Sequence, residues 1–265
     1  MQHREPANAA TSVLPAWISS TKVSVLLLSM RPDTWSRRRD EMGAMREPPK
    51  TAEDIVRAST RLRLVALVPE VRLHQASEPI RVWQRTEQAT GRTGLDPPFW
   101  AFAWAGGQAL ARYLLDHPEA VKDRQVIDIA SGSGLVAIAA AKAGAAAVTG
   151  YDIDPLAIAA ITLNAEANGV AVRAVRADIL DTDGAGTDVM LVADAFYERE
   201  LAGRVTRFLQ RGHARDADVL VGDFGRAYLP RDRLTPLAAY DVSGLSALED
   251  SDVKRTTIWA PLAAG

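Results

Sequence analysis

The sequence contains no cysteine among its 265 residues, and that absence removes several kinds of chemistry at once. It excludes disulfide bonds, thiolate metal sites and cysteine nucleophiles, and it fits a reducing compartment. The four histidines are scattered without the spacing of metal ligands, so we assign no metal site to His3, His74, His117 or His213.

An excess of charge of one sign is also lacking. The 31 lysine and arginine residues nearly balance the 33 aspartate and glutamate residues, which leaves a formal net charge of −2. A nucleic-acid-binding protein usually carries a basic face and a high isoelectric point. We therefore expect no nucleic-acid partner.

Long apolar runs are missing as well. A membrane-spanning helix needs roughly 18 or more consecutive apolar residues, whereas the early apolar run at residues 23–30 is short and contains serines. Acidic residues near the start of the chain break the pattern of a transit peptide. We therefore expect no membrane partner and a cytoplasmic location.

The organised part of the chain is expected to begin near the proline pair at residues 48–49. We predict a poorly ordered N-terminal extension over residues 1–48 and a single domain over residues 49–265. Thr51 can cap a helix, with Asp54 three residues later as its capping partner.

That N-terminal helix is predicted to run to about residue 67 and to end before Pro69. Residues 71–74 and 80–83 then read as two short strands. Together they predict a hairpin at the edge of the domain.

Short apolar segments alternate with helical ones over the rest of the chain. Five of them read as strands, at residues 125–129, 147–151, 172–175, 189–193 and 219–222. Helices are predicted before and between them, at residues 107–115, 135–143, 156–167 and 200–210. Such alternation indicates a parallel sheet with helices on both faces. Two more strands without a helix between them give the chain a β-rich end, at residues 238–242 and 256–259.

A glycine turn, Asp128-Ile-Ala-Ser-Gly-Ser-Gly134, joins the first of these strands to the next helix. Glycine allows a sharp turn and the close approach of a ligand, and the helix N-terminus offers free N–H groups. The motif alone is ambiguous, because residues 132–137 also match the G-x-G-x-x-[G/A] pattern of dinucleotide-binding enzymes.

Three aspartates at strand ends separate the two cofactor classes. Asp128 directly precedes the glycines, where a carboxylate suits the cationic ammonium and sulfonium of S-adenosylmethionine but not a pyrophosphate. Asp152 ends the next strand and can accept both ribose hydroxyls, a role common to both classes. Asp178 follows the third strand and can meet the adenine amino group. Asp154, just before Pro155, is interpreted as a helix cap.

This trio of acids resembles the cofactor motifs of class I methyltransferases. The resemblance implies a Rossmann-like seven-stranded α/β fold, with a mostly parallel sheet, an antiparallel last strand, and here also the N-terminal helix and short hairpin. It implies S-adenosyl-L-methionine as the cofactor. The residues expected to bind it are Asp128, Ala130, Gly132, Gly134, Asp152, Ile153, Asp178 and Trp104.

The fourth strand ends in a loop that contains Asp194 and Tyr197, where the fold brings the chain beside the bound cofactor. An acid and an aromatic there can orient a nucleophilic amine, and the pattern resembles the Asp-x-x-Tyr signature of a group of protein lysine methyltransferases. We predict that Asp194 orients the amine and that Tyr197 and Trp100 form the catalytic pocket around it. For Trp100, packing of the N-terminal helix on the sheet remains an open alternative.

Longer segments between residues 51 and 261 resemble the electron transfer flavoprotein β-subunit lysine methyltransferase family. Those segments are Thr60-Arg-Leu62, Pro69-Glu-Val-Arg-Leu-His74, Pro98-Phe-Trp-Ala-Phe-Ala-Trp104, Gly106-Gly-Gln-Ala-Leu-Ala-Arg-Tyr113, Asp194-Ala-Phe-Tyr197 and Gly222-Asp-Phe-Gly-Arg-Ala-Tyr-Leu-Pro230. Ala105 and Phe224 depart from the pattern, because proline is usual at both positions. Neither is a proposed catalytic carboxylate, so the departures bear on loop shape.

The resemblance implies methylation of lysine side chains on the electron transfer flavoprotein β-subunit and, in bacterial relatives, also on a ribosomal stalk protein. Three alternatives stay open: a methyltransferase for another ribosomal protein, one for a small-molecule amine, and a non-catalytic cofactor-binding protein. The last is disfavoured because a binding module does not require Asp194 and Tyr197. The absence of an obvious lid insertion in the sequence disfavours a small-molecule substrate.

Overall fold

The computed structural model describes residues 51–91, 93, 95–243 and 253–262. The N-terminal extension predicted over residues 1–48 lies outside the described residues, and the single domain over residues 49–265 stays a prediction. Within the described part of the chain, no helix is both long enough and apolar enough to cross a membrane.

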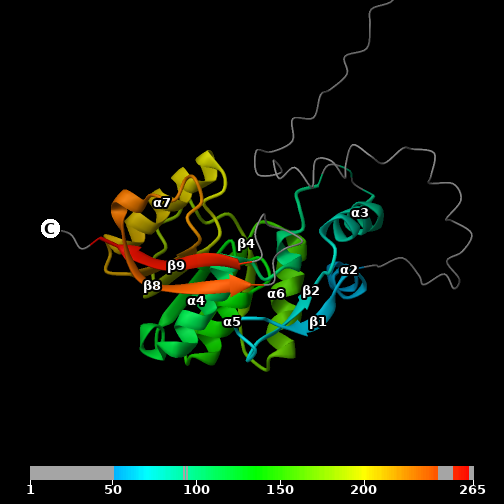
Figure 1. The fold of residues 1–265 in the computed structure, drawn as a ribbon, viewed down its shortest axis with the longest axis horizontal. Helices are drawn as coiled ribbons and strands as arrows, with labels where there is room; N and C mark the ends of the chain where they lie inside the picture. Colours follow the sequence, from blue (N-terminus) through cyan, green and yellow to red (C-terminus); the bar gives the residue numbers. More distant parts are fainter. Residues whose placement is uncertain (1–50, 92, 94, 244–252, 263–265) are drawn as a thin grey trace, which may run out of the picture. The chain divides into compact units, whose positions relative to one another are not determined.

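A seven-stranded sheet organises the described residues (Figure 1). Its strands in spatial order are β5 (Arg173–Arg176), β4 (Ala147–Asp152), β3 (Gln125–Ile129), β6 (Val189–Ala193), β7 (Asp218–Asp223), β9 (Val253–Pro261) and β8 (Leu234–Ser243). Neighbours from β5 across to β7 are parallel, and β9 runs antiparallel to both β7 and β8. This order, with its antiparallel last strand, confirms the predicted Rossmann-like seven-stranded fold.

Helices cover both faces of the sheet (Figure 1). Successive side chains of a strand point to opposite faces, so Val126 and Ile127 of β3 belong to two different core clusters. The first three helices pack on the Val126 face and the last on the Ile127 face, in the order α4 (Ala105–Asp116), α5 (Leu135–Lys142), α6 (Pro155–Ala167) and α7 (Arg199–His213).

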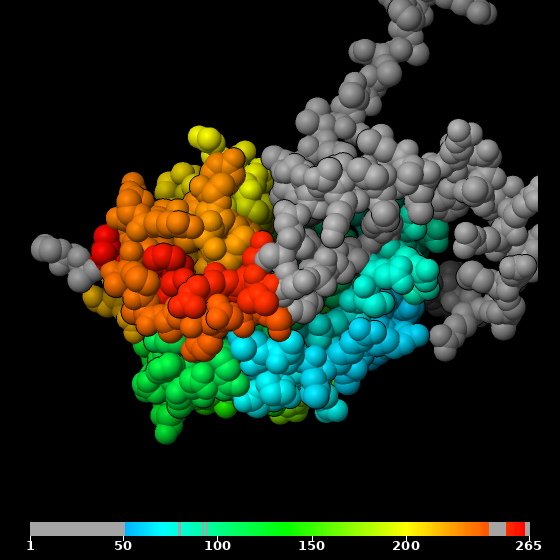
Figure 2. All heavy atoms as spheres, viewed as in Figure 1, coloured from blue at the N-terminus to red at the C-terminus, as the bar shows by residue number. Residues whose placement is uncertain are grey.

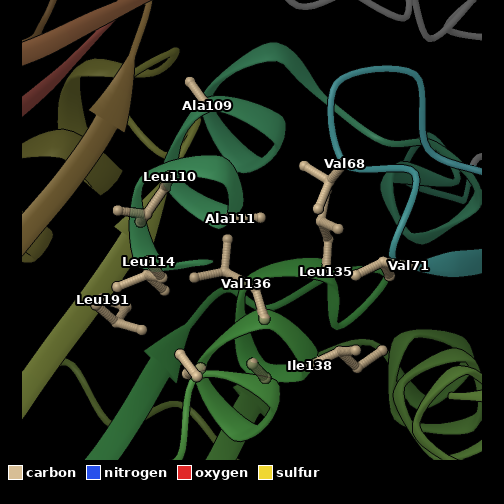
Figure 3. Close-up of a cluster of buried hydrophobic side chains, with 14 of the residues drawn as sticks. Val68, Val71, Ala109, Leu110, Ala111, Leu114, Leu135, Val136, Ile138 and Leu191 are labelled. Carbon is tan, nitrogen blue, oxygen red and sulfur yellow. The ribbon is translucent and has the colours of Figure 1, made fainter. Parts of the chain in front are cut away.

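The core under α4 and α5 is aliphatic (Figure 3). Leu110 and Leu114 of α4 lie near Val136 of α5 and Leu191 of β6, and all four side chains are buried. Burying one side chain of this kind contributes about 1.5–3 kcal/mol. The cluster therefore fixes α4 on the sheet, and with it the first turn of α4, which reaches the candidate site.

The N-terminal helix is shorter than predicted. α2 (Ala52–Ser59) begins with the predicted capping box, in which Thr51 and Asp54 exchange backbone-to-side-chain hydrogen bonds of 3.2 and 3.1 Å. The chain then leaves the helix, and β1 (Arg61–Leu64) pairs antiparallel with β2 (Arg72–Gln75). Extending the helix to residue 67 was wrong because the Arg-Leu-Arg-Leu run of β1 alternates with the period of a strand.

The predicted hairpin exists, but with another partner strand. Residues 80–83 lie in α3 (Pro79–Thr90), so their prediction as a strand was wrong. Helix-end signals explain the difference, since Pro79 stands at the start of α3 and Gly91 adopts the left-handed conformation at its end, with φ of 65°. The hairpin strand β1 lies at the surface, and the segment of α2, β1 and β2, blue to cyan, is visible in Figure 2.

Candidate active site

The predicted acids gather at the carboxyl ends of neighbouring strands. Asp128 lies near the end of β3, Asp152 ends β4, and Asp194 directly follows β6. From β3 the chain order runs outward in both directions, to β4 and β5 on one side and to β6 and β7 on the other. In open α/β sheets ligands bind at such a switch point, outside the carboxyl ends of the strands.

The glycine turn between β3 and α5 lies at this switch point. Ala130, Gly132 and Gly134 all have a left-handed backbone, with φ of 52°, 54° and 79°, a region that side chains disfavour. Space is a second requirement at Gly134, because a Cβ there would lie 3.2 Å from the Cα of Ile161. The turn therefore offers backbone to a ligand at the start of α5, where the first N–H groups of a helix have no partner within the helix.

Asp128 is a buried acid, with 2 % of its surface exposed. One carboxylate oxygen accepts hydrogen bonds from the Ser131 hydroxyl at 2.5 Å and from the Ala137 N–H at 3.2 Å. Burial outweighs these bonds and raises the pKa of Asp128 to about 7. No ion pair between described residues involves this carboxylate. A cationic ligand group would therefore stabilise its charged form.

Asp152 faces the same turn from β4. Its carboxylate accepts the N–H of Gly132 at 2.9 Å and that of Asp154 at 3.0 Å, and burial raises its pKa. A carboxylate offers about four acceptor sites, so Asp152 can also accept a ribose hydroxyl. Asp154 caps α6 by accepting the N–H of Leu156 at 2.8 Å, which confirms its interpretation as a helix cap.

Two other residues predicted on this side are more exposed. Ile153, next to Asp152, is 63 % exposed. Asp178, after β5, forms an ion pair with Arg204 of α7 at 2.9 Å and accepts the N–H of Leu180 at 3.1 Å. The hydrogen bond from Arg204 holds the pKa of Asp178 below its ordinary value. Contact of Asp178 with an adenine amino group stays a prediction.

Three aromatic rings connect the glycine turn with the loop after β6. The Phe99 ring lies 5.9 Å from the Trp104 ring and 5.5 Å from the Tyr197 ring, measured between centroids. Trp104 Nε1 donates to the Phe99 carbonyl at 2.9 Å, and a Cβ on Gly132 would lie 4.0 Å from that same oxygen. Burial raises the pKa of Tyr197 to about 12, so its hydroxyl stays protonated.

Trp100 does not join these rings. It lies in the 3-10 helix η3 (Phe99–Ala101), is 1 % exposed, and packs in one cluster with Val56 of α2 and Leu156 of α6. Its burial favours core packing, the alternative that the sequence left open, and its predicted position in the pocket wall stays a prediction. Phe99, which the sequence analysis did not single out, makes the contact with Tyr197 instead.

Asp194 is held by three partners. Its backbone is left-handed, with φ of 58°, and its N–H donates to the Gly222 carbonyl at 3.0 Å. One carboxylate oxygen accepts the N–H of Gly107 at 2.8 Å, and the other accepts the guanidinium of Arg226. The Asp194 side chain is only 11 % exposed. Such a strained non-glycine residue, held by its surroundings, is typical of a functional site.

Close backbone packing makes this arrangement possible. A Cβ on Gly106 would lie 2.2 Å from the Gly222 carbonyl oxygen and 2.6 Å from an Asp194 carboxylate oxygen. The start of α4 therefore touches the end of β7 directly, which brings the N–H of Gly107 to Asp194. Ala105 forms the first residue of α4, so the helix begins without the proline that the resemblance leads one to expect.

Two charged residues of this site, Asp223 and Arg226, were not predicted from the sequence. Asp223 ends β7 fully buried, and one of its oxygens accepts the N–H groups of Gly225 and Arg226 at 2.6 and 2.7 Å. Burial raises the pKa of Asp223. The guanidinium of Arg226 lies 3.5 Å from its other oxygen and 4.2 Å from the centroid of the Phe224 ring. The family resemblance includes residues 222–230, but no pattern within them assigns these roles.

A cavity of about 280 Å³ lies elsewhere, between α2, the hairpin and α3. Its lining includes the four arginines Arg61, Arg63, Arg81 and Arg85. None of the predicted site residues borders it, so it is distinct from the candidate active site.

Curated proteins similar to this chain are named electron transfer flavoprotein beta subunit lysine methyltransferase. The protein of Mus musculus is 34 % identical over 203 residues, which cover 73 % of this chain and 77 % of the mouse protein. The protein of Homo sapiens is also 34 % identical over 203 residues, covering 73 % of this chain and 75 % of the human protein.

Other similarities cover less of the chain or are more distant. A family model described as ribosomal protein L11 methyltransferase (PrmA) matches residues 109–197. The ribosomal protein L11 methyltransferase of Haemophilus influenzae (strain PittEE) is 58 % identical over 53 residues, 20 % of this chain and 18 % of that protein. A solved structure of magnesium protoporphyrin IX methyltransferase (ChlM) from Synechocystis PCC 6803 with bound SAM is 14 % identical, with a TM-score of 0.45, and the match covers 69 % of this chain and 84 % of that one.

Proposed function

The chain belongs to the family of electron transfer flavoprotein β-subunit lysine methyltransferases, and from this premise we propose that it methylates lysine side chains of the electron transfer flavoprotein β-subunit. The methyl donor is S-adenosyl-L-methionine. One observation carries the proposal: a loop beside the switch point holds a largely covered carboxylate, Asp194, and an aromatic ring, Tyr197, where an amine can meet the donor.

The residues around the glycine turn fit S-adenosyl-L-methionine. The donor carries positive charge, and Asp128 is a buried acid without an ion-pair partner among the described residues, whereas a pyrophosphate would meet that acid with like charge. Asp128, Asp152 and the backbone of the turn would hold it, with Ile153 and Trp104 beside them. When bound, this group supplies a methyl on a sulfonium, which departs as a neutral thioether once the lysine nitrogen has taken the methyl.

The protein's own task is to prepare the nucleophile. Lysine has a reference pKa near 10.4, so roughly one side chain in a few thousand is neutral at pH 7. Desolvation beside the Phe99 and Tyr197 rings lowers the pKa of the substrate amine. Asp194, fixed by Gly107 and Arg226, accepts an N–H of that amine and orients its lone pair. Correct orientation of the reacting groups accounts for several kcal/mol of the barrier.

The similarity to the L11 methyltransferases does not favour a ribosomal protein as the main acceptor. It ends at residue 197 and so leaves out Asp223 and Arg226, which lie beside Asp194. A ribosomal stalk protein is kept as a second acceptor to be tested. A cytoplasmic location is part of the proposal, on the basis of the sequence alone.

Intact-mass analysis tests the proposed reaction. Recombinant electron transfer flavoprotein β-subunit, incubated with the full chain and S-adenosyl-L-methionine, should gain mass in steps that correspond to methyl groups replacing hydrogens. The Asp194→Ala variant should bind the donor normally but react at least about 100-fold more slowly, because the amine is no longer oriented. Calorimetry with the donor is the control for folding and donor binding.

Two results would change the proposal. An Asp194→Ala enzyme with full turnover would refute the role of Asp194. Donor binding without any gain in mass would keep the fold and the donor but exclude this acceptor, and parallel assays with a ribosomal stalk protein and with small amines would then identify the acceptor class.

A further inference from the structure

Arg226 brings a positive charge onto the carboxylate that is proposed to receive the substrate amine. Its guanidinium donates to Asp194, and the two side chains are 13 % and 11 % exposed. A largely buried ion pair seldom adds stability in itself, because both charges lose their hydration. Its position suggests a role in the chemistry, since Asp194 and Arg226 together present little net charge to a ligand.

Charge balance decides which form of lysine this site prefers. A lone carboxylate within about 4–6 Å of an amine favours the ammonium form. The ammonium has no lone pair and cannot accept a methyl group. A carboxylate already balanced by a guanidinium can still accept a hydrogen bond from a neutral amine, but it gives the ammonium much less advantage.

We propose that Arg226 is a positioning residue that fixes the Asp194 carboxylate and balances its charge, so that the site favours the neutral, nucleophilic form of the substrate lysine. This inference rests on the proposed function and deepens it. It assigns to Arg226 an effect on the protonation of the substrate that Asp194 alone cannot have.

The surroundings hold Arg226 from two sides. Asp223 accepts the N–H groups of Gly225 and Arg226, which fixes the turn after β7, and its second oxygen lies 3.5 Å from the guanidinium. The Phe224 ring lies 4.2 Å from the Arg226 Cζ, and the same ring lies 4.6 Å from Lys254 Nζ of β9. Stacking of a guanidinium on an aromatic ring keeps its plane oriented, so the hydrogen bond to Asp194 is preorganised.

The elements packed against the pair differ in the charged groups that they contribute. The first turn of α4 contributes only the Gly107 N–H, and no acidic side chain. Asp223 acts electrostatically on Asp194 and Arg226, and Lys254 contacts the Phe224 ring that Arg226 also contacts. Tyr197, in the loop of Asp194, is acted on by Glu198, Asp96, Asp152 and Arg226. Among the basic groups of the described residues, Arg226 forms the ion pair with Asp194.

The pH dependence of turnover tests this assignment. With acceptor and donor saturating, kcat reports groups of the bound complex, and it is measured from about pH 6 to about pH 10, up to the reference pKa of lysine. In Arg226→Gln, the acidic limb should move upward by about one pH unit or more, because the lost cation raises the pKa of the bound lysine. Turnover should therefore fall about tenfold near pH 7 and recover in alkaline solution.

Two further variants serve as controls. Arg226→Lys retains the charge, so its acidic limb should stay near that of the wild type even if kcat falls. Arg233→Gln removes an arginine that is 58 % exposed and lies 3.8 Å from Asp232, and its profile should not change. Donor affinity and thermal unfolding are measured for every variant, so that a loss of donor binding or of folding is separated from an effect on the pH profile. Donor affinity should not depend on Arg226 if its role is the one proposed.

The possible outcomes separate this inference from the proposed function. A wild-type enzyme that methylates no acceptor refutes the proposed function, and the inference falls with it. An active wild type with an Arg226→Gln variant that is slower by the same factor at every pH overturns the inference alone. If Arg226→Gln does not fold, Arg226→Lys decides, because a shifted acidic limb in that variant would also overturn it.

Discussion

The carboxylates on the two sides of β3 differ in how their negative charge is balanced. On the β4 side, Asp128 is buried and Asp152 is partly buried, and both carboxylates accept hydrogen bonds from hydroxyl or N–H donors. Burial raises both pKa values. On the β6 side, the Asp194 side chain is also largely covered, but it forms an ion pair with the guanidinium of Arg226. The β4 side leaves a negative charge for the ligand to balance, whereas the β6 side balances its charge within the chain.

This difference matches what each side has to bind in the proposed reaction. The donor is a cation, so an unbalanced acid at Asp128 attracts it. The acceptor must react as a neutral amine, so an unbalanced acid at Asp194 would favour the wrong form. Two acids at one edge of a sheet thus have different tasks, which their environments set.

The largest effect that separates the two sides is expected from Gly106→Ala. The added Cβ would lie 2.2 Å from the Gly222 carbonyl oxygen, so α4 must move away from β7 and take the N–H of Gly107 away from Asp194. Turnover should fall at least about 100-fold, since a small displacement of an orienting group is enough. Donor affinity by calorimetry should change little.

Gly107→Ala is the matched control for this variant. Its Cβ would meet the Leu135 side chain at 3.7 Å, an ordinary contact, and the N–H to Asp194 is retained. An equal loss of turnover in both glycine variants would show that general damage to α4, and not the approach to β7, is responsible.

On the β4 side, the matching variant is Asp128→Asn, which should weaken binding of the donor. Replacing the carboxylate by an amide removes a charge-assisted contact with the donor, and affinity should fall about 10- to 100-fold by calorimetry. Asp154→Asn is the control, because asparagine also caps a helix and Asp154 accepts the Leu156 N–H as the cap of α6. Unchanged affinity in Asp128→Asn would refute the proposed contact.

The same variant should be more stable than the wild type at pH 8. The folded-state pKa of Asp128 is raised from 3.8 to about 7. In the pH window between these two values, the folded chain therefore holds a proton on Asp128 that the unfolded chain has lost. The free energy of unfolding of the wild type therefore falls as pH rises through the window. Asp128→Asn should gain up to about 4 kcal/mol at pH 8 and nothing near pH 4. Denaturant unfolding at both values measures the difference.

We expect pH to have a smaller effect, on the affinity of the wild-type protein for the donor. The donor requires the ionised form of Asp128, whose pKa is about 7 before the donor binds. Affinity should therefore decrease about tenfold between pH 8 and pH 6. Titration calorimetry at several pH values measures this slope, and an affinity independent of pH would contradict the role of Asp128 as the partner of the donor's charge.

The smallest effect is expected from Phe224→Leu. The ring stacks on Arg226 at 4.2 Å and also contacts Lys254, and a cation–π contact at a partly exposed site contributes about 0.5–1 kcal/mol. Turnover should fall about two- to fivefold, without a change in donor affinity. A loss as large as that of Arg226→Gln would mean that the ring, and not the ion pair, fixes the guanidinium.

The strands of the large sheet could be predicted from the sequence, because they are short apolar runs between turns. Residues 125–129 and 189–193 were predicted with the bounds that β3 and β6 have. The sequence was insufficient near the N-terminus, where local patterns conflict. Residues 80–83 alternate like a strand, but the proline and glycine that frame α3 determine a helix.

The candidate site was predictable only where its residues lie close together in sequence. Asp128 and the glycines form one motif, and Asp194 and Tyr197 form another. Arg226 was not predictable, because nothing local shows that a turn 32 residues further on returns to Asp194. For Trp100 the sequence left two positions open, because neighbours in an aromatic run can face different sides: Phe99 faces Tyr197, while Trp100 is buried.

The reach of these contacts along the chain also bears on the order in which the protein folds. The hydrogen bonds of Asp128 span 3 and 9 residues, and that between Gly132 and Asp152 spans 20. Asp194 reaches back 87 residues to Gly107, so its surroundings are complete only when α4 has docked on β7. Contacts between distant residues form later, because closing long loops loses more chain entropy. We therefore expect a folding chain to become able to hold the donor before it can act on an acceptor.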